Sequence, residues 1–386
     1  MDDNLFNTNF EYELAQKLYK AYLDARKRGK RKTKDEHAFE INEYENLVNL
    51  RKSLLDRTYK PSRSTAHIVK RPVRREIFAA PFRDRIIHHL IYNEVGEWWD
   101  RQFIHDSYSC RKGKGTLMGI LRLDHHIKVV SRGYARKAYV LKLDIQGYFM
   151  SLPREKLLKT ALAGLEKQQK REPKSKEMYK LLEFLWEQII MDDPVDGARR
   201  IGGLREWEKL PKTKSLFYQP KNRGIVIGNL TSQLLSNIYL NRLDCYIAMD
   251  LGYKHYGRYV DDFYIVIDEA GLPQLKRDIC AIEEFLRSIG LTLHPNKRLL
   301  REVHQGVPFL GAVIYPNRIV PSARLLKNIY KAFKLVVAGE HTLDSVASYL
   351  GHLKHLNSYK IVKKVFDKTG WTYDDDDLFR NSRQKR

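Results

Sequence analysis

Three aspartates occupy positions where carboxylates could bind metal ions. Asp144 ends the apolar run AYVLKLDI (residues 138–145), which predicts a buried strand, and Asp261 and Asp262 separate two β-rich runs in GRYVDDFYIVI (residues 257–267). A buried charge is costly unless it has a partner. If the two segments form neighbouring strands, their carboxylates can hold two Mg²⁺ ions, as two-metal phosphoryl transfer requires. Taken alone, the Asp-Asp pair also fits a solvated turn.

A third segment contains a glycine before a predicted helix. In GIVIGNLTSQLLSNIYLN (residues 224–241), Gly228 permits close backbone approach, and Asn229 or Thr231 can cap the following helix. The helix N-terminus would then face an anionic or base-paired substrate. A well-capped core helix is the structural alternative.

Composition favours a polyanionic partner. The 386 residues carry 70 Lys+Arg against 47 Asp+Glu, a formal charge of +23, and seven of the nine residues 26–34 are basic. Hydrophobic residues make up 43%, which argues against global disorder. No apolar run approaches the roughly 20 residues of a membrane-spanning helix, and the acidic N-terminus lacks a signal-peptide pattern. The three scattered cysteines (Cys110, Cys245 and Cys280) favour neither a disulfide framework nor a zinc site, and a reducing cytoplasmic setting is expected.

Strands and helices alternate irregularly, which favours an α+β sheet with helices on one face over a doubly wound sheet. The patterns predict helices over 1–60, 82–104, 153–170, 176–191, 230–249, 272–290 and 322–366. They predict a basic hairpin over 64–80, the strand 138–145, a strand-turn-strand over 253–267, and short strands over 291–300 and 307–320. Residues 192–224 read as an irregular insertion, and the acidic-then-basic tail from 369 reads as disordered.

Taken together and in this order, the three segments resemble the palm of reverse transcriptases. Further resemblance comes from RREIFAAPFRDRIIHHLI (74–91), FIHDSYSCRKGKGT (103–116), LTLHPNKR (near 292–299) and VPFLGAVI (307–314). The resemblance covers about 300 residues, roughly 64 to 366. It implies a right-hand polymerase fold with fingers, an antiparallel palm sheet backed by helices, and a small helical thumb.

This resemblance also implies domain boundaries. We expect a basic helical N-terminal extension (1–63), fingers (64–137, with part of 150–225 returning to them or to the palm), a palm (138–320), a helical thumb (321–368) and a charged tail (369–386).

Within the superfamily, the string Ile227-Gly228-Asn229-Leu230-Thr231-Ser232-Gln233 is similar to the reverse transcriptases of diversity-generating retroelements. Group II intron, retron and retroviral enzymes usually carry Gln where Ile227 stands and Pro where Gln233 stands. The late HLKHLNSYK (352–360) also resembles that family. The family implies a bacterial or phage setting, copying of a template-repeat RNA into cDNA that is mutagenised at template adenines, and a basic pentameric accessory variability protein as partner.

Residue roles follow from the same resemblance. Asp144, Asp261 and Asp262 would bind two Mg²⁺ ions, with Mn²⁺ as an alternative, and Ile145 would offer a backbone carbonyl. Incoming deoxynucleotides would contact the following residues: Arg75, Arg83, Gly147, Tyr148, Phe149, Ile227, Gly228 and Lys297. Phe149 would crowd a ribose 2′-hydroxyl, and Lys297 could protonate pyrophosphate. Lys70, Arg74 and Arg85 are weaker candidates for phosphate contacts.

Template RNA and the RNA/cDNA duplex would contact a further set of residues: Arg111, Lys112, Lys114, Ser232, Gln233, Tyr259 and Gly311. Ile227 is linked to fidelity by hypothesis, because a branched alkyl group cannot brace the nascent base pair by hydrogen bonding as Gln can. The alternatives are a group II intron-like, retron-like or phage-defence reverse transcriptase, an RNA-templated RNA polymerase, and a non-enzymatic basic RNA-binding protein.

Overall fold

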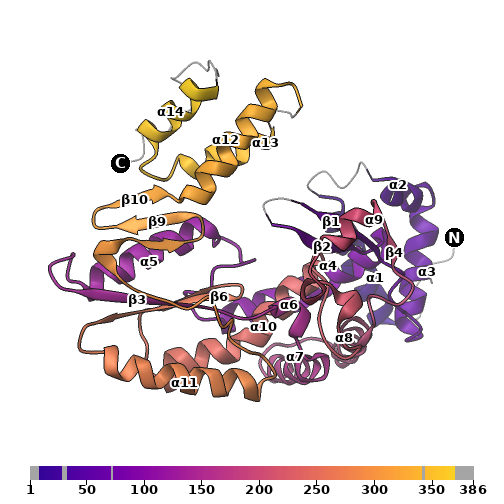
Figure 1. The fold of residues 1–386 in the computed structure, drawn as a ribbon. Helices are drawn as coiled ribbons and strands as arrows, with labels where there is room; N and C mark the ends of the chain where they lie inside the picture. The colour runs from indigo at the N-terminus through magenta and orange to yellow at the C-terminus, as the bar shows by residue number, and fades with distance from the viewer. Residues whose placement is uncertain (1–7, 28–32, 71–72, 341–343, 370–386) are drawn as a thin grey trace. The chain divides into compact units, whose positions relative to one another are not determined.

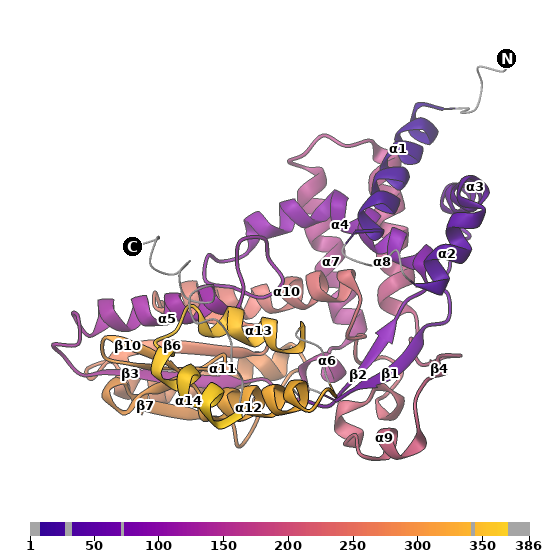
Figure 2. The same ribbon diagram turned by 90° about the horizontal axis from the view of Figure 1, so that it is seen from above.

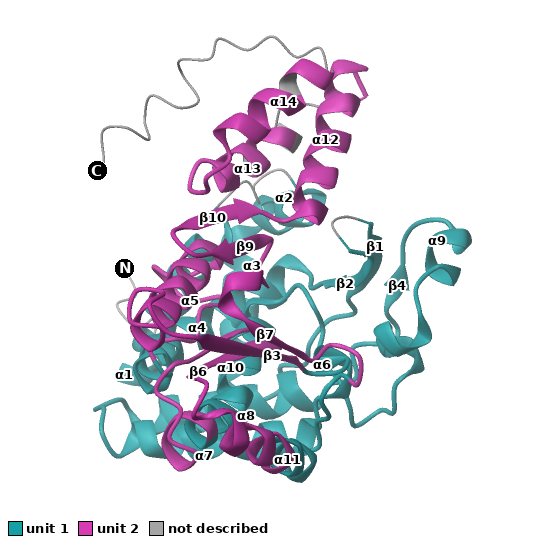
Figure 3. Cartoon of the chain, turned by 60° about the vertical axis from the view of Figure 1, so that its left-hand side comes forward, with its two compact units in different colours: residues 1–104, 145–246, 282–294 teal, residues 105–144, 247–281, 295–386 magenta. Residues whose placement is uncertain are grey.

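The computed structural model describes residues 8–27, 33–70, 73–340 and 344–369. The chain forms two compact units, each assembled from segments that are separate in sequence (Figure 3). Unit 1 comprises residues 1–104, 145–246 and 282–294, and unit 2 comprises residues 105–144, 247–281 and 295–386. Within the described ranges, no helix combines the length and the apolar character needed to cross a bilayer.

The helices of unit 1 pack around α4 (Phe82–Gln102). The apolar positions with helical spacing in this segment, among them Ile86, Leu90 and Val95, are all buried. α1 (Asn9–Ala25) and α10 (Leu230–Cys245) both lie against α4. The remaining long helices of this unit are α2 (Lys34–Ile41), α3 (Glu43–Leu55), α7 (Arg154–Gln169) and α8 (Lys176–Met191).

A small sheet in unit 1 joins the basic hairpin to the insertion. β1 (Thr65–Val69) and β2 (Arg75–Ala79) pair antiparallel, as predicted, and β4 (Arg199–Arg200) adds to the far edge of β1 (Figure 2). The insertion also contains α9 (Leu204–Glu208) and two 3₁₀ turns, Lys212–Lys214 and Leu216–Tyr218. The buried Glu76 carboxylate of β2 accepts hydrogen bonds from Ser215 Oγ at 2.5 Å and Leu216 N at 2.8 Å. These two bonds connect the insertion to β2.

The main sheet of unit 2 is antiparallel throughout, with the strand order β5-β6-β3-β7. Its strands are β3 (Ala138–Asp144), β5 (Tyr256–Tyr259), β6 (Asp262–Asp268) and β7 (Leu299–Glu302). α5 (Thr116–Val130) lies alongside β3 of this sheet (Figure 1). It buries Ile120, Leu123 and Ile127 in a core shared with Val140 and Val266 of the sheet. The expected combination of an antiparallel sheet and a covering helix is confirmed.

Unit 2 also holds a smaller sheet and a helical cluster. The sheet consists of β8 (Val307–Phe309), β9 (Ala312–Tyr315) and β10 (Arg318–Pro321). The helices are α12 (Ala323–Val337), α13 (Asp344–Leu353) and α14 (Tyr359–Thr369). They share their own core, which includes Ile329, Phe333, Val346 and Val362.

Several predicted boundaries are wrong in detail. The helix predicted over 230–249 ends at Cys245 and continues as a π-helical turn, Tyr246–Asp250. The strand predicted over 291–300 is reduced to β7, because Pro295 and Asn296 form a turn before it. α11 (Leu272–Ser288) ends just before Gly290, whose φ of +81° suits a glycine after a helix. Residues 28–32 of the basic run and residues 370–386 of the tail lie outside the described residues, and the predicted domain boundaries stay predictions.

Candidate active site

The main sheet of unit 2 brings the three aspartates to one end of two neighbouring strands. Asp144 is the last residue of β3, and its register partner on β6 is Asp262. Tyr259 of β5 pairs with the same Asp262, so Val260 and Asp261 form a two-residue hairpin turn. The predicted strand-end aspartate and the predicted Asp-Asp hairpin therefore lie on adjacent strands of one sheet. Asp144 is only 6% exposed.

The hairpin turn is held in a strained backbone conformation. Val260 has a φ of +56°, in the left-handed region that β-branched residues rarely adopt. Such strain persists only where the surrounding structure enforces it, and it concentrates at functional sites. The turn places Asp261 beside the strand ends that carry the other two carboxylates.

Two lysines balance the carboxylates. Lys297 Nζ donates hydrogen bonds to both carboxylate oxygens of Asp144, at 2.8 and 2.9 Å. Lys142, two residues before Asp144 on the same face of β3, lies with Nζ 5.4 Å from the centre of the Phe309 ring. Burial lowers the pKa of Lys142, while the carboxylates of Asp262 and Asp144 oppose that shift.

Burial and repulsion among the three carboxylates both raise the pKa of the aspartates in the hairpin. Burial, followed by the charges of Asp144 and Asp262, raises the pKa of Asp261 to about 6. Burial also raises the pKa of Asp262, with Lys142 acting in the opposite direction. A site with these properties favours a bound cation, because a positive charge relieves both the desolvation and the repulsion of the carboxylates.

The donor chemistry fits a hard divalent ion, since carboxylate oxygens on paired strand ends are the ligands that Mg²⁺ takes in small number. Across the described part of the chain, however, no three His, Cys, Asp or Glu side chains are gathered closely enough to hold a metal ion as they stand. In the structure the Lys297 ammonium is the cation on Asp144.

In unit 1, the predicted nucleotide-facing loop lies against β2, the strand that begins at Arg75. Phe78 N donates a 3.0 Å hydrogen bond to Ile227 O. Gly228 has a φ of +132°, and a Cβ there would lie 2.6 Å from Phe78 O. The close approach that the sequence assigned to this glycine is made to the β2 backbone, and no other residue type fits without displacing it.

The predicted ribose-facing residue shares an apolar cluster with this loop. Phe149 and Ile227 both pack against the buried residues Ala66, Phe78 and Met150. Gly147, at φ +54°, begins α6 (Tyr148–Ser151), and the Tyr148 side chain is buried with its hydroxyl donating to Ser236 O at 2.7 Å. The structure therefore brings Gly147–Phe149, Ile227, Gly228 and β2 together.

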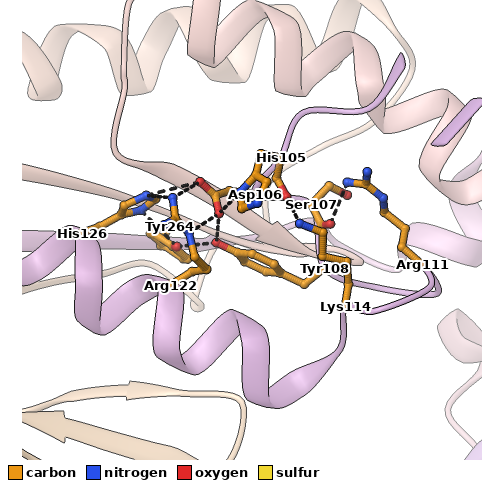
Figure 4. Close-up of polar contacts among 9 residues, drawn as sticks. All are labelled: His105, Asp106, Ser107, Tyr108, Arg111, Lys114, Arg122, His126 and Tyr264. Carbon is orange, nitrogen blue, oxygen red and sulfur yellow. Dashed lines mark hydrogen bonds and ion pairs between the residues drawn. The ribbon is translucent and has the colours of Figure 1, made fainter. Parts of the chain in front are cut away.

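The basic candidates differ in how they are engaged. Arg75 is exposed, whereas Arg83 donates to Lys60 O at 2.7 Å and lies 5.0 Å from the Tyr59 ring centre. Arg111 Nη1 donates to Ser107 O and Lys114 Nζ to His105 O, each at 3.0 Å, so both side chains support their own loop (Figure 4).

The other template candidates are dispersed. Ser232 is buried in α10, and Gln233 beside it is exposed. Tyr259 Oη accepts a hydrogen bond from Thr116 Oγ1 at 3.4 Å in unit 2. Leu310 and Gly311, with φ of +46° and +88°, form the turn between β8 and β9. Lys112 is exposed, and the buried Ile145 follows Asp144 directly.

Sequence reasoning missed a buried polar network beside the hairpin. Asp106, Tyr108, Arg122, His126 and Tyr264 contact one another (Figure 4). The fully buried Arg258 lies next to this network. Lys142 was also missed, although a lysine inside an otherwise apolar strand is a visible signal. An Asp-x-Tyr in a loop carries no comparable signal, because its partners are distant in sequence.

Residues 68–314 match the family described as "Reverse transcriptase (RNA-dependent DNA polymerase)". This match confirms the expected fold class, a right-hand polymerase fold with mixed helices and antiparallel sheets. No curated protein matches the chain.

Solved structures similar to the chain include telomerases. The telomerase of Candida albicans, in complex with a fragment of telomeric RNA, is 13% identical with a TM-score of 0.47, over 86% of this chain and 64% of that one. Apo telomerase from Candida tropicalis is 12% identical with a TM-score of 0.47, over 81% and 59%. The chain thus spans less than two thirds of the length of these proteins.

Proposed function

We propose that this chain, which belongs to the reverse transcriptase family, is an RNA-directed DNA polymerase that extends a primer with deoxynucleotides. The observation that carries the proposal is the register pairing of Asp144 with Asp262, with Asp261 at the adjoining turn. Three carboxylates at neighbouring strand ends have little use in a binding protein, because their repulsion and desolvation must be offset by other interactions.

In the proposed mechanism, Asp144, Asp261 and Asp262 hold the metal ions. Two bound Mg²⁺ ions would lower the pKa of the primer 3′-hydroxyl and stabilise charge on the triphosphate. Burial and the neighbouring carboxylates raise the pKa of Asp261 to about 6, and a bound cation would favour its ionised form. Lys297, which contacts Asp144 in the structure, would give its Nζ proton to departing pyrophosphate.

The proposed nucleotide pocket uses residues of unit 1. Arg75 offers an exposed guanidinium to the triphosphate, a match in geometry as well as charge. Phe149 would exclude a 2′-hydroxyl by filling the space beside the ribose. Gly228 keeps the loop close to β2, and in this proposal Ile227 would contact the nascent base pair.

Primer extension on an RNA template tests this proposal. The wild-type chain should incorporate deoxynucleotides in the presence of Mg²⁺, and Asp261→Asn should reduce turnover roughly a hundredfold or more. Asp268→Asn is the matched control, because Asp268 ends the same strand, β6, at the opposite end from Asp262. RNA binding without synthesis by wild type, D261N and D268N alike would favour a non-enzymatic RNA-binding protein.

We further propose that the template is the repeat RNA of a diversity-generating retroelement, in a bacterial or phage setting, with a basic pentameric accessory protein as partner. Support comes from Ile227 and Gln233, which stand where related reverse transcriptases usually carry Gln and Pro. Ile227 O pairs with β2, the strand that carries Arg75, so a loosened check at Ile227 would act beside the triphosphate.

Sequencing of cDNA tests this narrower proposal. Ile227→Gln should lower misincorporation opposite template adenines, with Ile227→Val as the control that keeps a branched alkyl group. An unchanged rate of misincorporation opposite template adenines in I227Q would show that Ile227 does not determine fidelity. Synthesis measured with and without the accessory protein and its cognate RNA tests the partner. Full, accurate copying of unrelated RNA by the chain alone would instead favour a group II intron-like or retron-like enzyme.

A further inference from the structure

The loop before α5 pairs with the edge strand β5 of the main sheet of unit 2. Arg258 N donates to Asp106 O at 2.8 Å, and Tyr108 N donates to Arg258 O at 2.9 Å. These bonds form a parallel bridge between Ser107 and Arg258, a residue of the edge strand β5. The loop is thus attached to the strand that leads directly into the Val260–Asp261 turn.

The Arg258 side chain reaches the turn itself. Arg258 has no exposed surface, and its Nη1 donates to Val260 O at 3.0 Å. Its Nη2 donates to Ser107 Oγ at 3.3 Å. A guanidinium has its donors in a fixed planar fork, so these contacts define the position of the Val260 carbonyl relative to the loop. Val260 is the residue with the strained φ of +56°.

The loop is in turn anchored to α5 through Asp106. Arg122 donates to both Asp106 carboxylate oxygens, at 2.7 and 2.9 Å, and His126 Nε2 lies 3.3 Å from Oδ2 (Figure 4). Burial opposes the ionisation of Asp106, but the hydrogen bonds from His126 and Arg122 outweigh it and hold the pKa of this carboxyl well below its usual range.

Two tyrosines close the network over the strands. Tyr108 Oη lies 2.7 Å from Tyr264 Oη, and Tyr264 Oη lies 3.2 Å from His126 Nδ1. Gly257 fits beneath this pair, since a Cβ there would lie 2.5 Å from each hydroxyl. Close contacts therefore join the loop that contains Asp106 and Tyr108 to α5, β5 and β6.

We propose that Arg258 is a positioning residue for the reaction: anchored through the Asp106 loop, it holds the Val260 carbonyl and thereby fixes the Asp261 carboxylate. The catalytic consequence rests on the proposed polymerase activity. The geometric consequence, a turn that loosens when Arg258 is lost, does not. A misplacement of about 1 Å at a reacting group can cost roughly a hundredfold in rate.

Two measurements on Arg258→Met and Arg258→Lys test the proposal. In steady-state primer extension, kcat should fall by about ten- to a hundredfold while the KM for deoxynucleotide changes less than about twofold, because the buried Arg258 has no exposed surface to offer a nucleotide. R258K keeps the positive charge and a single donor nitrogen in place of the planar fork, so it should recover part of kcat. By hydrogen exchange, amides of residues 260–262 should exchange faster in both variants, while those of α5 stay protected.

Asp106→Asn extends the test if R258M fails to fold. It keeps the shape of Asp106 and weakens its anchor, so it should lower kcat and speed exchange at 260–262. Asp124→Asn is the matched control. Asp124 is a buried carboxylate on the same helix as Arg122 that accepts from Tyr134 Oη at 2.9 Å and Lys128 Nζ at 2.7 Å. D124N should leave kcat and the turn unchanged.

The kinetic and exchange results together support or overturn the positioning role of Arg258. Slower turnover at unchanged KM, with faster exchange at the turn in D106N but not in D124N, supports the positioning role. Native exchange at 260–262 and wild-type kcat in a folded R258M or D106N overturns it. If the wild-type chain shows no synthesis, the polymerase proposal fails, and the exchange data alone decide whether Arg258 holds the turn.

Discussion

A buried histidine predicts a specific loss of stability in acid. His88 on α4 is only 5% exposed, and its Nδ1 lies 2.8 Å from Thr231 Oγ1 of α10. Burial, with smaller contributions from His89 and Arg85, lowers the pKa of His88 from 6.5 to about 3. Below pH 6.5 the unfolded chain therefore binds a proton at this position that the folded chain excludes, and stability falls as the pH falls toward 3.

The size of the effect follows from proton linkage. Each pH unit inside this window changes the free energy of unfolding by about 1.4 kcal/mol for one proton. Between pH 8 and pH 5, the protonation of His88 in the unfolded chain should thus lower the free energy of unfolding by about 2 kcal/mol. His88→Gln keeps a polar group but does not titrate, so the variant should lack this part of the pH dependence.

Urea unfolding at pH 8 and pH 5 measures this loss of unfolding free energy. The loss of stability between the two pH values should be about 2 kcal/mol smaller in H88Q than in wild type. His37→Gln, at an exposed position on α2, controls for the removal of a histidine as such. Parallel pH curves for wild type and H88Q would refute the reasoning, because they would mean that His88 takes up its proton in the folded chain.

Three further predictions follow from packing and charge. Gly164→Ala places a Cβ 1.9 Å from Trp99 Cζ2 and should destabilise the fold by about 1–3 kcal/mol in thermal unfolding, whereas Gly351→Ala, with open space around it, should not. Phe149→Ala should raise ribonucleotide over deoxynucleotide incorporation roughly tenfold; unchanged selectivity would contradict a role for the ring. RNA affinity should fall steeply between 50 and 200 mM salt because the net charge is +23, and a flat profile would argue against phosphate contacts.

Local sequence patterns were enough to predict the strand that ends at Asp144 and the hairpin turn that carries Asp261. An apolar run with a polar last residue, and two carboxylates between β-rich runs, are signals within a dozen residues. The sequence suggested only that the two segments could form neighbouring strands, and the register that pairs Asp144 with Asp262 comes from the structure.

The network around Arg258 could not be predicted in the same way. Its partners, Ser107 and Asp106, lie about 150 residues earlier in the chain, and only the tertiary pairing of a loop with an edge strand brings them together. Lys297 shows a related limit. The sequence suggested a basic group near the triphosphate, but its 2.8 Å contact with Asp144 depends on how the turn at Pro295 directs the chain.

The left-handed backbone of Val260 also has a consequence for engineering. Left-handed geometry costs an ordinary residue roughly 1–2 kcal/mol, and glycine or asparagine adopts it at much lower cost. Val260→Gly and Val260→Asn are therefore expected to raise thermal stability. Because this gain comes from relieving the backbone strain next to Asp261, the same substitutions are expected to lower turnover.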